Sequence, residues 1–169
     1  AVIGDAEIDA LRAAGVGEIT VARIEPGDVP EDIAAAEVAA AAVGDAVHVD
    51  RAFTGRANLF AEAAGVLVVD KAGVDRLNAI DPDITLATLP PFAPVVPGKM
   101  IATVKIIPFA VSAASRDRAL AAARADAPLV RIAPYRLRKI ALISTMLPGL
   151  AGKVVDKTLK ITADRLAPA

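Results

Sequence analysis

Residues 83–109, DITLATLPPFAPVVPGKMIATVKIIPF, hold two apolar, β-branched runs that a proline-rich loop separates. The first run, 83–89, and the second, 99–109, have the length and residue types of β-strands. Two such runs close together in the chain indicate a hairpin-like, antiparallel pair. We therefore expect at least part of the sheet in this protein to be antiparallel.

Helix-like and strand-like segments alternate on both sides of this pair. The expected helices span 6–15, 25–43, 71–80 and 112–127, the further expected strands span 18–24, 46–50, 65–70 and 139–145, and 128–139 reads as extended. Residues 51–62 fit either a loop followed by a strand or a short helix. Alternation of this kind predicts the α/β class, here a mixed sheet with flanking helices.

The helix expected within 25–43 has the clearest start signal. Asp28 is a candidate N-cap, Pro30 suits the first turn, and Glu31 completes a D-x-x-E capping box. Asp70 is a candidate cap for the helix over 71–80.

Composition excludes several classes of function. The chain has 169 residues, 55% of them hydrophobic but only 3% aromatic, and its net charge of −1 gives no general attraction to nucleic acid or to an anionic membrane. It has no cysteine, which removes disulfides and thiolate chemistry and is compatible with a reducing cytoplasm. The most apolar stretch, 33–43, is too short to cross a membrane.

Three isolated polar residues are candidates for chemistry. His48 is the only histidine, too few for a zinc site, so we interpret it as structural or exposed. Arg56, in TGRANL (54–59), offers a fork for phosphate or carboxylate, although a tight turn with a solvated or ion-paired arginine explains the same residues. Lys105 interrupts an apolar strand, either to protect a sheet edge, the interpretation we favour, or to point into a site.

A second candidate region is LISTMLPGLAGKVVDKTLKITADRL, 142–166. Thr145 stands at the end of an expected strand, Gly149 lies in the loop that follows, and Asp156, Lys157 and Thr158 are expected to open a helix. The ends of such strands and the starts of such helices favour phosphate-bearing ligands. The alternative is that Asp156 only caps the helix and Lys157 is solvated.

Three stretches, GRANLFAEAAGVLVVD, LNAIDPDITLATLPPFAPVVPGKMIATVKIIPFAV and KIALISTMLPGLAGKVVDKTLKITADRL, carry a family resemblance. Together they resemble the bacterial molybdopterin-binding proteins, distant relatives of the molybdopterin molybdotransferases (MoeA-type). The resemblance implies that Thr145 matches the family's loop threonine and that Asp156, Lys157 and Thr158 match its helix-start triplet. Met146 and Leu147 replace the family's glycine and acidic residue, which speaks against molybdate insertion.

The resemblance implies an N-terminal α/β domain over 1–137 and the start of a molybdopterin-binding α/β/α domain over 138–169. The expected function is molybdopterin binding in molybdenum cofactor biosynthesis or delivery, with the cofactor bound at Thr145, Gly149, Asp156, Lys157 and Thr158. A binding module is favoured over a catalyst; an enzyme of this kind is expected to be molybdotransferase-like.

The alternative is a non-catalytic interaction domain. In that interpretation 1–137 form a homo-oligomer or dock to a molybdoenzyme. Its surface contacts are PPFAPVVPG (90–98) and the basic RIAPYRLRK (131–139), which contains Arg131, Arg136, Arg138 and Lys139.

Overall fold

The computed structural model describes residues 3–137 and 139–167, so Arg138 of the basic stretch lies outside the described residues. The helices are α1 (Asp5–Ala13), α2 (Glu31–Ala42), α3 (Lys71–Asn78), α4 (Ala113–Arg124) and α5 (Gly152–Leu166). The strands are β1 (Asp28–Pro30), β2 (Val47–Val49), β3 (Arg56–Ala61), β4 (Gly65–Val69), β5 (Ile84–Thr88), β6 (Pro94–Val95), β7 (Met100–Ile106), β8 (Ala110–Ser112) and β9 (Val130–Pro134).

The strands of the described residues form three small sheets. A four-stranded sheet has the order β2-β3-β7-β5, a three-stranded sheet the order β6-β4-β9, and β1 pairs with β8. All these ladders are antiparallel, and a parallel contact occurs at the isolated bridge between Val43 and Val130. The predicted antiparallel pair is confirmed, because β5 lies beside β7 with Leu86 opposite Val104.

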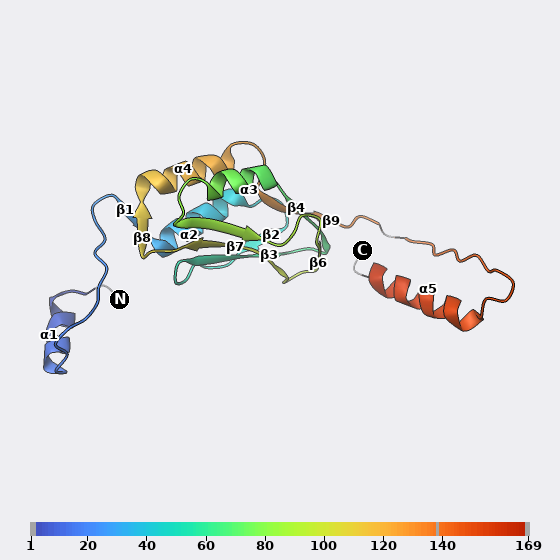
Figure 1. Cartoon of the computed structure of the whole chain (residues 1–169), viewed down its shortest axis with the longest axis horizontal. Helices are drawn as coiled ribbons and strands as arrows, with labels where there is room; N and C mark the ends of the chain where they lie inside the picture. The colour runs from blue at the N-terminus through green and yellow to red at the C-terminus, as the bar shows by residue number, and fades with distance from the viewer. Residues whose placement is uncertain (1–2, 138, 168–169) are drawn as a thin grey trace.

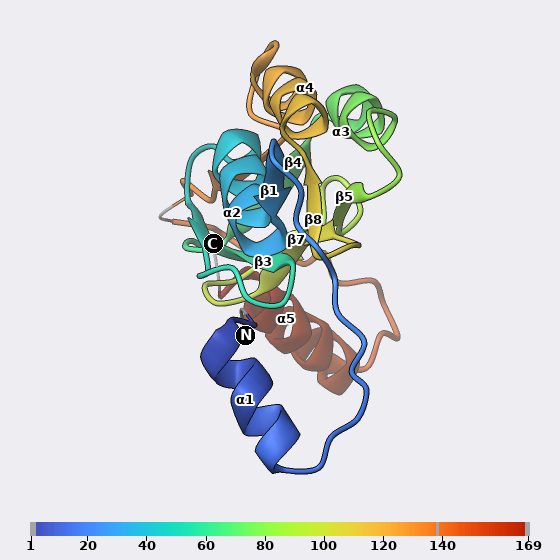
Figure 2. The same ribbon diagram turned by 90° about the vertical axis from the view of Figure 1, so that its left-hand side faces the viewer.

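Helices α2, α3 and α4 cover one side of the four-stranded sheet, as Figures 1 and 2 show. Helix α2 packs on β3 and β7, and α4 packs on α2. Close packing of α2 is possible because its inward residues are small: Ala35, Ala39 and Ala42 are fully buried. They meet the buried alternate residues of the sheet, such as Leu59 and Val104. The predicted α/β class with flanking helices is thus confirmed. The expected mixed sheet is not formed, because the described strands pair in three sheets whose ladders are all antiparallel.

Helices α1 and α5 lie apart from this central body, at its two ends (Figure 1). Residues 16–27, which join α1 to β1, are exposed and form no strand; a turn at Pro26 and Gly27 leads into β1. The predicted strand over 18–24 is therefore wrong. Its β-branched sequence suits a strand, but residues 18–24 have no strand beside them to supply backbone partners.

The predicted start of α2 is also wrong in detail. Asp28 does not cap α2 but belongs to β1, opposite Ser112, and its carboxylate accepts a hydrogen bond from the Glu25 amide at 3.0 Å. The N-cap is Pro30, and the Glu31 amide donates to the Phe109 carbonyl at 2.9 Å. A tertiary backbone contact thus replaces the capping box. The Asp70 cap of α3 is confirmed, because its side chain accepts from the Gly73 amide at 3.0 Å.

The loop between α3 and β5 is tied to α4 through Asp81. A hydrogen bond from the Ser115 side chain, a second from the Asp83 amide and the positive charge of Arg118 lower the pKa of Asp81. A carboxyl whose pKa is lower in the folded chain contributes stability above its unfolded pKa of about 4, and loses that contribution as the pH falls through the folded pKa.

We expect Asp81→Asn to lower the free energy of unfolding at pH 7 by no more than about 1 kcal/mol, since this contact is partly solvated. The difference in the free energy of unfolding between the variant and the wild type should shrink toward pH 3. There the Asp81 carboxyl becomes protonated and is then neutral, like the asparagine amide. Thermal unfolding at both pH values measures it. An equal difference at pH 7 and pH 3 would contradict the electrostatic explanation.

Candidate functional site

The residues expected to bind the cofactor lie in the C-terminal segment, and the structure changes their local setting. Helix α5 begins at Gly152 with Ala151 as its N-cap, so Asp156, Lys157 and Thr158 lie in the second turn instead of opening the helix. The free amides at the helix start belong to Gly152 and Lys153. The predicted placement of the triplet at the helix start is therefore wrong.

The strand predicted over 139–145 is not formed either. This segment is extended and exposed, and none of its residues belongs to a β-ladder of the described chain. Its apolar side chains face solvent, and Ile143 is 90% exposed. A buried strand needs neighbours on both sides, and no strand of the three sheets lies beside it. Thr145 is consequently exposed on an extended segment.

Several polar groups of this segment are free to meet a ligand. Asp156 and Lys157 are exposed, and neither forms an ion pair or side-chain hydrogen bond with a described residue. The Thr158 hydroxyl donates to the Val154 carbonyl at 2.9 Å, which leaves its oxygen as an acceptor. Gly149 has φ of +87°, a left-handed conformation that favours glycine in the loop.

Arg56 and Lys105, two unrelated candidates in the sequence, lie together in the structure. They are cross-strand partners on β3 and β7, and Thr85 of β5 follows in the same row. Register partners share a face. The residues beside them in the strands, Ala57 and Val104, are fully buried in the core, so Arg56 and Lys105 lie on the opposite face. Figure 1 shows α2, α3 and α4 on one side of the sheet only. The edge-strand interpretation of Lys105 is wrong, because β7 is an interior strand.

A tight turn, 53–56, carries Arg56 into the sheet. Phe53 and Arg56 exchange backbone hydrogen bonds of 2.9 and 3.2 Å, and both residues between them, Thr54 and Gly55, have positive φ. This is the pattern of a two-residue type I′ hairpin turn. The Gly55 amide donates to Asp32 of α2 at 2.8 Å, which holds the turn against the helix. The predicted tight turn is confirmed, and Arg56 is exposed.

The remaining polar candidates behave as surface residues. His48 is exposed, and its Nε2 lies 3.2 Å from an Asp50 carboxylate oxygen. Within residues 3–137 and 139–167 no group of three or more histidines, aspartates and glutamates could hold a metal ion. None of the described helices is both long and apolar enough to cross a membrane.

Comparison with protein-family models, with curated proteins and with solved structures finds no match to this chain.

Proposed function

We propose that this chain is a non-catalytic molybdopterin-binding module of molybdenum cofactor biosynthesis or delivery, acting in the cytoplasm. The observation that supports this most directly is the pair of unpartnered, exposed side chains of Asp156 and Lys157 on the second turn of α5. A carboxylate and an ammonium group suit the amino groups and the phosphate of a pterin phosphate.

The loop before α5 completes the proposed contact surface. Thr145 supplies an exposed hydroxyl, Gly149 gives the loop its left-handed bend, and Thr158 offers an acceptor oxygen. The free amides of Gly152 and Lys153 favour the ligand's phosphate. All these groups are exposed, so this segment makes at most one wall of a site and its affinity should be modest.

The test is a calorimetric titration of the full chain with molybdopterin. We expect Asp156→Ala to weaken binding by about tenfold, as the loss of one charged hydrogen bond does. Asp164→Ala is the matched control, because Asp164 is exposed on the same helix and pairs with Lys160 at 3.4 Å. Binding that is unchanged by Asp156→Ala would contradict the site.

A second candidate function, an interaction or dimerisation domain that docks to a molybdoenzyme, is supported by exposed apolar side chains on the stretches expected to make contacts. Phe92 in the proline-rich loop is 75% exposed and has φ of +65°, and Leu137 beside the basic residues is 66% exposed. The absence of molybdopterin binding in the same titration, together with a dimeric mass in a separate measurement in solution, would favour this candidate. A monomer that binds molybdopterin would favour the first.

A further inference from the structure

We propose that the uncovered face of the four-stranded sheet binds a phosphate-bearing small molecule, with Arg56 and Lys105 holding the phosphate. This site is separate from α5, so the inference does not depend on the molybdopterin proposal.

Strand register brings the two cationic side chains close together. The Ile106 amide donates to the Gly55 carbonyl at 2.8 Å, which makes Gly55 and Ile106 a hydrogen-bonded pair. Pairs alternate along an antiparallel ladder, so Arg56 and Lys105 form the next, non-hydrogen-bonded pair. In such pairs the Cβ atoms lie only about 4.5–5.5 Å apart. One phosphate group can therefore contact both side chains.

The positive charge of this pair is not neutralised by the described chain. Neither Arg56 nor Lys105 belongs to any of the ion pairs or side-chain hydrogen bonds formed by residues 3–137 and 139–167. The carboxylate of Asp50, in the next row, lies 3.2 Å from His48 Nε2 and forms no ion pair with either cation. Like charges directly opposite one another destabilise a sheet, and a bound anion reverses that penalty.

Neighbouring side chains add a donor and a stacking surface. Asn58 lies two residues from Arg56 on the same face, and its side-chain amide makes no hydrogen bond within the described chain. Arg56 lies between Lys105 and Phe53, which is its cross-strand neighbour on the side opposite Lys105. Phe53 is 74% exposed. A phosphate between the two cations would thus lie beside an exposed aromatic ring, which suits a ligand with a planar ring system.

The turn also fixes the backbone of Arg56 before any ligand binds. The Gly55 amide is bonded to Asp32, and both sides of the turn are hydrogen bonded between Phe53 and Arg56. Lys105 is on an interior strand, so its backbone is held on both sides. A backbone that is already fixed adds no ordering cost of its own when a ligand binds.

The test is calorimetric titration of the full chain with guanosine monophosphate, inorganic phosphate and guanosine. We expect the nucleotide to bind, phosphate to bind more weakly and guanosine not to bind measurably. Arg56→Gln and Lys105→Gln should each weaken nucleotide binding about tenfold or more, the cost of a charge-assisted hydrogen bond. Lys71→Gln, an exposed lysine on α3, is the matched control and should change it less than twofold.

Thermal unfolding of the ligand-free variants tests whether they remain folded, and their Tm is a readout independent of binding. Because Arg56→Gln removes the repulsion between two like charges, it should raise Tm slightly, by about 1–3 °C, while it weakens binding. A purely structural role would lower Tm. Nucleotide binding that is as strong in both variants as in the wild type, or no binding of any phosphate ligand up to about 10 mM, would overturn the proposal.

Discussion

Gly55→Ala is expected to lower the free energy of unfolding by about 3 kcal/mol, because two costs add. Gly55 has φ of +70°, and a residue with a side chain pays about 1 kcal/mol or more in that conformation. An added Cβ would also lie 2.7 Å from the Ile106 carbonyl oxygen and 2.6 Å from a Glu31 carboxylate oxygen. Glu31 can rotate away, but the carbonyl is fixed in the sheet, so overpacking adds about 1–3 kcal/mol.

The adjacent residue provides the matched control. Thr54 also has a positive φ, +49°, so Thr54→Gly removes strain from the same turn. It should leave the stability unchanged or raise it by up to about 1 kcal/mol. Urea unfolding of both variants measures the two effects. If Gly55→Ala and Thr54→Gly have equal stability, the turn does not need the conformation seen here.

Gly55→Ala should also affect the proposed phosphate site. Moving the turn away from Ile106 displaces the neighbouring Arg56 relative to Lys105, so the variant should lose nucleotide affinity even at temperatures where it is fully folded. Thr54→Gly should keep that affinity.

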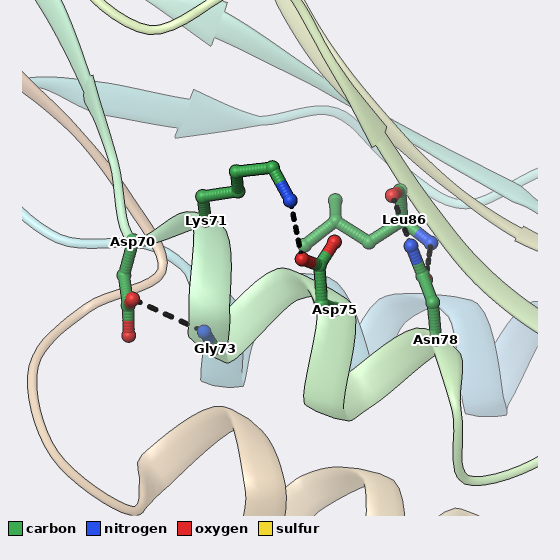
Figure 3. A network of polar contacts seen from close by, with 6 residues as sticks. All are labelled: Asp70, Lys71, Gly73, Asp75, Asn78 and Leu86. Atoms are coloured by element: carbon green, nitrogen blue, oxygen red, sulfur yellow. Dashed lines mark hydrogen bonds and ion pairs between the residues drawn. The ribbon is translucent and has the colours of Figure 1, made fainter.

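The second large effect is expected at Asn78, the last residue of α3. Its side-chain amide donates to the Leu86 carbonyl at 3.1 Å, and its oxygen accepts from the Leu86 amide at 2.8 Å (Figure 3). Leu86 lies on β5, an edge strand, and these backbone groups point away from β7. Asn78 therefore satisfies the edge of the sheet in place of another strand.

We expect Asn78→Ala to lower the free energy of unfolding by about 2 kcal/mol, roughly 1 kcal/mol for each lost hydrogen bond. It should also promote self-association, because it exposes unpaired backbone groups on an edge strand. Urea unfolding and light scattering measure the two effects.

The control lies two turns away on the same helix. Lys71 and Asp75 form an exposed i,i+4 pair at 2.5 Å (Figure 3), and Lys71→Ala should cost no more than about 0.5 kcal/mol. Should the two alanine variants prove equally stable and equally monomeric, Asn78 would have no role in protecting the edge.

Local sequence signals predicted the elements of the central body well. Alternating β-branched runs located β5 and β7, and the alanine-rich run within 25–43 located α2, although the predicted start of that helix was wrong. Asp70 was correctly predicted as a cap because capping needs just a few neighbouring residues. The same signals failed for 18–24 and 139–145, since apolar runs of strand length become strands only where another strand lies beside them.

For the candidate sites too, the sequence indicated single residues but not which of them lie together. The sequence identified Arg56 and Lys105 as unusual residues, but 49 positions separate them, and no local pattern indicates that they are partners across two strands. Spacing along the chain also placed Asp156–Thr158 at a helix start, whereas α5 begins a turn earlier because Gly152 and Lys153 already adopt helical geometry.

The sequence by itself determined the α/β class, the tight turn at Gly55 and the exclusion of cysteine chemistry, since these depend on residue type and short-range geometry. The tertiary structure alone decided that Asp28 joins a strand, that β7 lies inside its sheet and that two cations meet on an uncovered face. The physical reason is that strand order and register are set by contacts between distant segments, which compete with local preferences and here override them.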